Sequence, residues 1–541
     1  MSLAYYFMTK DGTLPRRNYQ AEVVDSFCPQ STFKDLQSHS QNLPSRKVCL
    51  VDDRTNDGIN SISLGDYGPL TAQKLYLKLK EKRFHDRDEH SPEPPNSVSP
   101  SSRESPLPLD ADRRLVFITD IDRYAVAALM ATAPLSQVTA LGDTLYMHLA
   151  FKAYIGASIQ TRGFPFFSLS FHLPYFAWRS TTPQEQPRDN RLNRAGHPVR
   201  KVIDVSFLTS GVTPQITFKQ GDYLCEAQMS VLVLGPDDCR WTGLCLVDTY
   251  FDSEDQRECV DKYHADVPDG IQSDPFTEGI FDVHLPILDP REYFLAVLDC
   301  RAKVFMEEWK HSADKLAHRI DGYIAEHPFI SKHSTSPPGT ELRPFLSCIG
   351  QTRQHLREFI ECLRAPIRHW DDFKHRERFR TAAECRYISS IQETFVAAGH
   401  CLNQLESLCK RCDDLAKYLA LCMNDEGSRG MKLQARLTQY NHTLTHVFLY
   451  FCFPPILAAG MLSMHEEAIP GVLGPAKQSF IVLTIFLTTL VFIIVGFMQR
   501  WRDILLFVYD LVGTERIKIF AGKLTSPGGH DEDIELGGRL Q

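Results

Sequence analysis

The chain has 541 residues, of which 43% are hydrophobic and 23% are charged, a composition typical of a protein whose mass folds mostly in water. Its formal net charge is −8 and Lys and Arg form no basic run, so we exclude nucleic acid as a partner. No Walker A motif, nucleophile elbow, dinucleotide fingerprint or zinc-hydrolase spacing occurs, and we therefore expect neither an enzyme nor a cofactor.

The first 112 residues give the weakest structural signal. Residues 1–83 begin with neither the pattern of a secretory signal nor that of a transit peptide, and their fold is uncertain. Residues 84–112 are rich in Pro, Ser and charge, which predicts a disordered linker. Insertion into a membrane would therefore have to depend on a later segment.

Residues 113–290 predict a cytosolic α/β domain. Apolar runs such as RLVFITDI, FFSLSFHL, KVIDVSFL, AQMSVLVLG and RWTGLCLVDTYFD alternate with turn signals, and AVAALMATAPL predicts a helix. Asp248 and Asp252 lie in an acidic stretch at the end of the last run, and they are candidate ligands for a divalent cation because carboxylate oxygens suit Mg²⁺ and Ca²⁺. The alternative interpretation of the same stretch is a solvated acidic loop.

Residues 291–446 predict a helical region that ends in a long stalk. Helical patterns cover 291–327 and 340–369, and from Ile388 onward apolar or small residues recur at intervals of three and four, as in a heptad seam. The register resumes after the stretch DEGSRG and continues to Val447, which favours a single helix of about 90 Å. The alternative is a set of shorter helices divided at DEGSRG, where two glycines weaken the helix.

Residues 447–498 predict two transmembrane helices. The segment 479–498 has no charged residue and, as a helix, is about 30 Å long, the thickness of bilayer hydrocarbon. The segment 447–464 is also uncharged, but Pro454 and Pro455 remove helix hydrogen bonds and should bend it.

The flanking charges predict the orientation of these spans. Lys and Arg precede the first span and follow the second, so the positive-inside rule places both termini in the cytosol and the loop 465–478 outside. The tail, 499–541, is expected to be disordered at its end. The expected fold class is therefore a membrane α+β protein, with a cytosolic α/β domain, a long stalk helix and a C-terminal hairpin of two spans.

This order of parts resembles the CorA family of divalent cation channels. In that family the first span ends in Ala-Gly-x-x-Gly-Met-Asn before a short acidic loop, and here AAGMLSMHEEAIP places Ala459, Gly460 and Met464 in the same pattern. Ser463 replaces the second Gly and His465 replaces the Asn, so the Gly-Met-Asn signature is missing. The stretches HLAFKAYIGASI and SLSFHLPYFAWRS also look like those of a divergent fungal branch of CorA-like domain proteins. The resemblance implies a funnel-shaped homo-pentamer in the lipid bilayer.

The resemblance also assigns roles to residues of the first span and the loop. Rings of Glu466 and Glu467 would concentrate cations, whereas His465 becomes cationic in mild acid and would repel them or favour ions that accept imidazole. The expected pore mouth is Ser463, Met464, His465, Glu466 and Glu467. At helical spacing back from Ser463, the expected pore lining is Gly460, Ile456, Cys452, Leu449, Thr445 and His442, and the competing face carries Phe451, Ala458 and Met461.

The leading functional interpretation is passive transport of a divalent cation, Mg²⁺ first, through an oligomeric pore. The alternative is a membrane-anchored sensor or scaffold that keeps the fold but does not conduct, because a mostly apolar lining offers little to a hydrated ion. Both interpretations predict an integral, multi-pass membrane protein, with the plasma membrane favoured.

Overall fold

The structure is a computed structural model, which describes residues 3–9, 15–38, 43–56, 61–63, 68–84, 110–160, 165–209, 221–253, 259–264, 271–326, 339–376, 381–463, 478, 480–497 and 500. The chain divides into two compact units, Met1–Ala420 and Leu421–Gln541. Most of the predicted linker, from residue 85 to residue 109, lies outside the described residues, as does nearly all of the tail.

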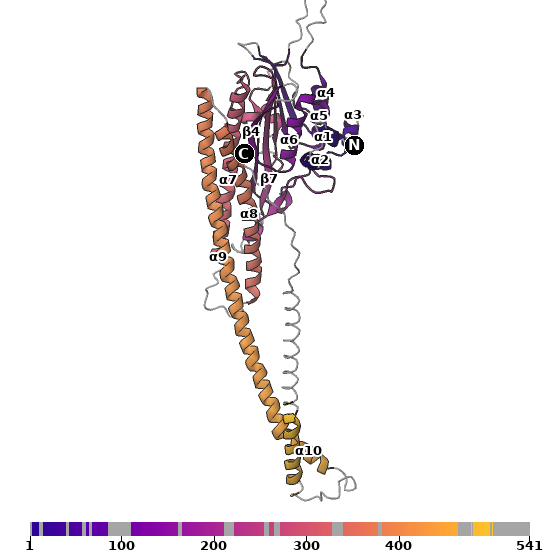
Figure 1. Ribbon diagram of the computed structural model, residues 1–541, viewed down its shortest axis with the longest axis vertical. Coiled ribbons are helices and arrows are strands. Elements are labelled where there is room, and N and C mark those ends of the chain that lie inside the picture. The colour runs from indigo at the N-terminus through magenta and orange to yellow at the C-terminus, as the bar shows by residue number, and fades with distance from the viewer. Residues whose placement is uncertain are drawn as a thin grey trace, which may run out of the picture. The chain divides into compact units, whose positions relative to one another are not determined.

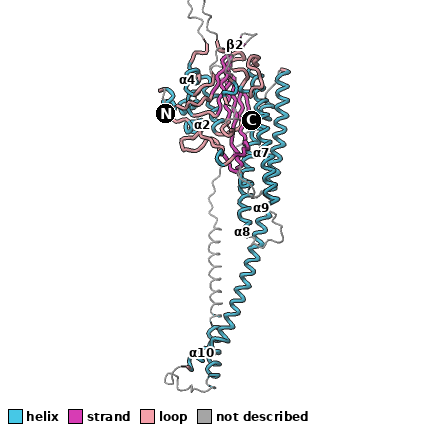
Figure 2. Tube along the Cα trace, turned by 180° about the vertical axis from the view of Figure 1, so that it is seen from behind, coloured by secondary structure: helices cyan, strands magenta, loops and turns pink. Residues whose placement is uncertain are grey.

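The first unit is built around a mixed sheet of eight strands, drawn in magenta in Figure 2. Seven strands follow the order β2-β1-β3-β8-β7-β5-β4, and β6 pairs with β7. The pairing of β3 with β8 is parallel, whereas the other strand pairs are antiparallel. The strands are β1 (Cys49–Asn56), β2 (Ser61–Ser63), β3 (Arg113–Thr119), β4 (Tyr154–Gln160), β5 (Phe166–Thr181), β6 (Val202–Asp204), β7 (Gly221–Gly235) and β8 (Trp241–Val247).

The centre of the sheet is the long ladder between β5 and β7. It runs from the pair Phe167 and Gly235 to the pair Thr181 and Gly221, and all 15 residues of β7 are buried. A strand covered on both faces needs apolar side chains on both, which explains the apolar run at 231–234 of β7. The apolar runs quoted above for β3, β5, β7 and β8 are confirmed as strands.

Helices cover both faces of the sheet (Figure 1). One face packs against a cluster formed with α1 (Leu3–Thr9), α2 (Pro15–Phe27), α3 (Gln30–Gln37), α4 (Ala72–Lys80), α5 (Arg123–Thr132) and α6 (Val138–Leu149). The N-terminal segment, to which the sequence assigned no fold, therefore supplies two strands and four helices to the same unit as the central domain. The other face packs against α7 (Pro290–Glu326) and α8 (Gly339–Arg376), which confirms the two helical stretches predicted from 291 and 340.

The stalk is a single helix, α9 (Ala382–Val447), of 66 residues. The backbone is helical throughout DEGSRG, so the alternative of a break at that stretch is wrong. Up to Leu419 the predicted seam is buried, apart from Ile388 and Leu402, which are half-buried. Phe395 of the seam stacks on Trp370 of α8 at 5.4 Å between ring centroids. This packing stabilises the helix only before the two glycines, because the seam beyond them, from Leu433 onward, is exposed.

Capping side chains explain where several helices begin. At the start of α9, the Glu384 N–H donates to Thr381 Oγ1 and the Thr381 N–H donates to the Glu384 carboxylate, both at 3.1 Å, which is a capping box. The Ala125 N–H donates to the Asp122 carboxylate at 2.7 Å at the start of α5. Each of these side chains satisfies an N–H that has no partner within its helix.

Candidate functional site

The second unit contains two helices that are long and apolar enough to cross a membrane, Met431–Met461 and Phe480–Phe497. Their large apolar side chains are mostly exposed, including Phe451 at 73% and Phe486 at 62%. A protein in water rarely leaves so much contiguous apolar surface uncovered, so lipid or further copies of the chain are the expected surroundings. The orientation of the spans stays a prediction.

The first of these helices is irregular where its prolines occur. α9 ends at Val447, a π-helical turn covers Phe448–Cys452, and α10 (Phe453–Leu462) follows with Pro454 in its first turn. Proline has no N–H to donate to the preceding turn, and a wider π-helical turn is one way in which a helix accommodates that loss. The sequence predicted a bend at the prolines, which stays a prediction, and the structure shows a π-helical turn immediately before them.

The two apolar helices contact each other through small and aromatic side chains. Ala458 of α10 is fully buried against Leu483 and Leu487 of the second helix. Tyr450 stacks on Phe492 with 4.2 Å between ring centroids and an angle of 21° between the rings. Ala458 belongs to the competing face named above and makes a contact within the chain, whereas Phe451 and Met461 of the same face are 73% and 43% exposed.

The predicted pore-lining residues lie on the other side of α10 or on the helix before it. Ile456 is 61% exposed, and Gly460 and Cys452 are also exposed, whereas Pro454 and Ala458 are buried. Further back, Leu449 is half-buried, and Thr445 and His442 are exposed. The structure therefore leaves the predicted lining accessible to neighbouring molecules, although it places no second chain there.

At the predicted pore mouth, the structure describes Ser463 alone. Its N–H donates to the Ala459 carbonyl at 3.0 Å and its hydroxyl donates to the Gly460 carbonyl at 2.9 Å, so Ser463 terminates α10. The other predicted mouth residues lie outside the described residues: Met464, His465, Glu466 and Glu467.

The structure gives arginine partners to both carboxylates that were predicted as weak cation ligands. Asp248 is fully buried and accepts from Arg191 Nη1 at 2.7 Å and from Arg200 Nε at 2.6 Å. Burial alone would raise the pKa of Asp248, but the two guanidiniums outweigh it and hold the pKa well below its usual range. Asp252 accepts from Arg179 Nε at 2.6 Å. A cation at Asp248 would have to displace a guanidinium, and Asp252 is already paired through one carboxylate oxygen, so we interpret both as structural ion-pair partners.

Two neutral histidines are buried beside this network. His148 Nδ1 lies 2.9 Å from Ser230 Oγ, and its Nε2 lies 3.6 Å from the Asp248 carboxylate. Burial lowers the pKa of His148, and burial together with the proximity of His148 lowers the pKa of His172 to about 3. The surroundings of these two residues therefore favour uncharged imidazole. The first unit should lose stability in acid, where the imidazoles would have to take up protons.

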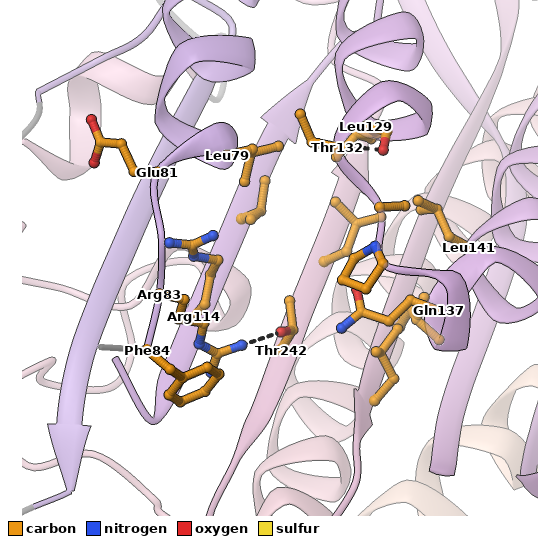
Figure 3. Close-up of a pocket in the computed structure, with 16 residues that line it drawn as sticks. Leu79, Glu81, Arg83, Phe84, Arg114, Leu129, Thr132, Gln137, Leu141 and Thr242 are labelled. Atoms are coloured by element: carbon orange, nitrogen blue, oxygen red, sulfur yellow. Dashed lines mark hydrogen bonds between the residues drawn. The ribbon is translucent and has the colours of Figure 1, made fainter. Parts of the chain in front are cut away.

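A cavity of about 310 Å³ lies between the sheet and helices α4, α5 and α6 (Figure 3). Its walls are mainly apolar and include Leu129 and Leu141, with Arg83 and Arg114 on one side. Arg83 Nη1 donates to Thr242 Oγ1 at 2.7 Å, and Arg114 forms two hydrogen bonds to the Asp53 carboxylate. Because these guanidiniums are engaged by the protein, the cavity offers mostly apolar contact.

Comparison with known proteins gives little further information. No family model matches the chain, and no curated protein matches it. Among solved structures, the complete structure of the CorA magnesium transporter from Methanocaldococcus jannaschii is similar over 84% of this chain and 99% of that chain, with 10% identity and a TM-score of 0.27. These values do not establish a family, so the functional argument depends on the residues themselves.

Sequence reasoning missed two features of the structure. The cavity is formed by segments that are distant in the sequence, and no local pattern indicates it. The second feature is the position of His446 beside the predicted lining residue His442, and here the spacing of four residues on a helix was a signal that could have been used.

Proposed function

We propose that the protein forms an oligomeric membrane pore that passes divalent cations, Mg²⁺ first. The observation that carries the proposal is the exposed face of the first apolar helix, with Ile456 and Gly460, on the side opposite to the contact made by Ala458. Helices that pair through one face and expose another can surround a central path when several copies assemble.

The stalk supports assembly of several copies. In the second unit, the seam residues Leu433, Leu437, Tyr440 and Leu444 are between 50% and 64% exposed, although the same seam is buried in the first unit. An apolar stripe at heptad spacing is the surface with which helices associate in coiled coils. A bundle of these helices would cover the stripe and lead into the membrane, and the resemblance to the CorA family implies five copies.

The loop provides the chemistry for collecting cations. Glu466 and Glu467 would form carboxylate rings at the outer mouth, where they raise the local concentration of cations. His465 replaces the amide side chain of the CorA signature, and its protonation in mild acid would place positive charge in the same ring. Transport is therefore expected to decrease in acid.

A non-conducting sensor or scaffold is the second candidate function. It is favoured by the apolar character of the lining, in which Ile456 and Leu449 offer no oxygen ligand to a hydrated ion. In that case the two spans would only anchor the large first unit.

Ion flux into liposomes that contain the purified full-length protein tests the proposal. We expect Mg²⁺ influx in the wild type, and greater influx after Ile456→Ser, because a hydroxyl promotes wetting of an apolar constriction. Ile485→Ser is the matched control, since Ile485 is also 61% exposed but belongs to the second apolar helix. Flux in this control should equal that of the wild type.

The outcomes separate the two candidate functions. Flux in the His465→Asn variant but not in the wild type would indicate a pore that this histidine closes. An absence of Mg²⁺, Co²⁺, Ni²⁺ and Zn²⁺ flux in all variants, at pH values on both sides of the histidine range, would contradict the pore and support the scaffold.

A further inference from the structure

Two histidines on one face of α9 lie close together inside the apolar helix Met431–Met461, just before α9 ends at Val447. His442 and His446 are one helical turn apart, their ring centroids are 4.2 Å apart, and their Nε2 atoms are separated by 3.3 Å. His442 is exposed and His446 is half-buried, so solutes can reach the pair.

The separation of the two nitrogens matches the requirement of a single metal ion. Imidazole nitrogens bind Zn²⁺ at about 2.0–2.1 Å, and at a tetrahedral angle two such nitrogens are about 3.3 Å apart. Two histidines at positions i and i+4 of a helix are also the arrangement with which helical zinc motifs present their ligands. The separation of the two Nε2 atoms, 3.3 Å, is therefore already the one that chelation of a single ion requires.

Aromatic contacts hold the second ring in this orientation. The His446 ring stacks on Tyr450 with 5.6 Å between centroids and an angle of 9°, and Tyr450 in turn stacks on Phe492 of the second apolar helix. Fixing a ligand before the metal arrives reduces the entropy lost on binding.

We propose that His442 and His446 chelate one transition-metal ion of the Zn²⁺, Ni²⁺ or Cu²⁺ class through their Nε2 atoms. Among the described residues no group of three or more His, Cys, Asp or Glu side chains is placed to hold a metal, so water would complete the coordination. Mg²⁺ is excluded as the ion that this pair binds, because Mg²⁺ prefers oxygen ligands and keeps its water shell. The site is formed within one chain, and it does not depend on whether the protein conducts ions.

A hydrogen bond between the two rings accounts for the same distance and is the competing explanation. In that arrangement one Nε2 carries a proton and donates it to the other ring. Metal binding requires a lone pair on both Nε2 atoms, so the donating ring would move its proton to Nδ1 and both rings would stay neutral. Protons compete with the metal ion for these lone pairs, so metal binding should weaken in acid, as it does at other imidazole sites.

Zn²⁺ titration of the full-length protein in detergent, prepared without a polyhistidine tag, tests the proposal by calorimetry. The chain has 20 histidines and 15 cysteines, and any of them can bind Zn²⁺. The difference in binding between wild type and variant, and not the total binding, therefore identifies the site. We expect the wild type to bind one more equivalent of Zn²⁺ than His446→Ala, or to bind that equivalent at least about tenfold more tightly than the variant does. The reason is that the second imidazole binds the ion intramolecularly. An excess of Mg²⁺ should not compete.

Two control variants give the test its specificity. His400 is exposed on the same helix and has no histidine one turn away, so His400→Ala should bind as the wild type does. The double variant Leu444→His, His446→Ala keeps two histidines but places them about 200° apart around the helix, and it should bind as weakly as His446→Ala.

Equal Zn²⁺ binding by the wild type and His446→Ala would overturn the proposal and leave the hydrogen bond as the explanation. Full binding by the double variant would overturn it too, because the geometry of the pair would then be irrelevant. Circular dichroism of each variant, compared with the wild type, verifies that the helix is intact, and none of these results depends on ion flux.

Discussion

Substituting Asp248 tests whether this carboxylate stabilises the fold or binds a cation. In Asp248→Ala, the guanidiniums of Arg191 and Arg200 lose a fully buried counterion at 2.7 and 2.6 Å. Arg191 keeps Asp189, whose carboxylate lies 2.8 Å away. The Arg200 guanidinium keeps the backbone carbonyls of His148 at 2.7 Å and Leu149 at 3.5 Å, neither of which carries a charge. Removing one partner of a buried pair costs about 3–5 kcal/mol, and we expect a loss of unfolding free energy in that range.

Asp252→Ala is the matched control. Arg179 keeps Glu308 at 2.9 Å after this change, and the side chains of Arg179, Asp252 and Glu308 are each about one-fifth exposed, at 22%, 18% and 21%. An ion pair that is partly solvated and has a remaining partner contributes little, so the expected loss is about 1 kcal/mol or less.

Chemical unfolding in detergent, followed by tryptophan fluorescence, measures both losses. Four of the five tryptophans are buried in the first unit, so their emission reports on it: Trp178, Trp241, Trp309 and Trp370. Each protein is measured with and without excess Mg²⁺. An equal loss in both variants would refute the reasoning, and so would stabilisation by Mg²⁺ of the wild type but not of Asp248→Ala, because a bound ion stabilises only the form that binds it.

Two further predictions concern the stability of the first unit. Phe395→Ala should lower the unfolding free energy by about 3–5 kcal/mol, because the ring is 3% exposed and its removal leaves a cavity in the seam. Val396→Ala, at a side chain that is 49% exposed, should change the unfolding free energy by about 0.5 kcal/mol or less. Similar losses in the two variants would contradict the burial of the seam. The folded-state pKa of His172, about 3, is below the unfolded value of 6.5, so its contribution to stability is present above pH 6.5 and is lost as the pH falls toward 3. Between pH 6.5 and pH 5 this loss amounts to about 2 kcal/mol, and His172→Asn should flatten the measured profile; an unchanged slope would refute the assignment.

Much of the helical architecture was predictable because its signals are local. The seam from Ile388, the capping box at Thr381 and the uncharged span from residue 479 each depend on neighbours within a few turns of helix, so periodicity and composition indicate them directly. The pair of His442 and His446 belongs to the same class, since its spacing alone places the two rings on one face. The glycines of DEGSRG show the limit of such signals, because the stalk stays helical where propensity favoured a break.

The sequence by itself thus determined the long helices from residue 291 onward, the seam and the apolar spans, whereas the tertiary structure decided which distant segments meet. It paired β1 with β3 across the predicted linker, and β3 with β8 in parallel, and it brought the guanidiniums of Arg191 and Arg200 to Asp248. These contacts join residues up to 128 positions apart, as Arg113 and Trp241 show. A single sequence contains no local record of such contacts, because strand order and charge pairing depend on how the whole chain returns on itself and excludes water.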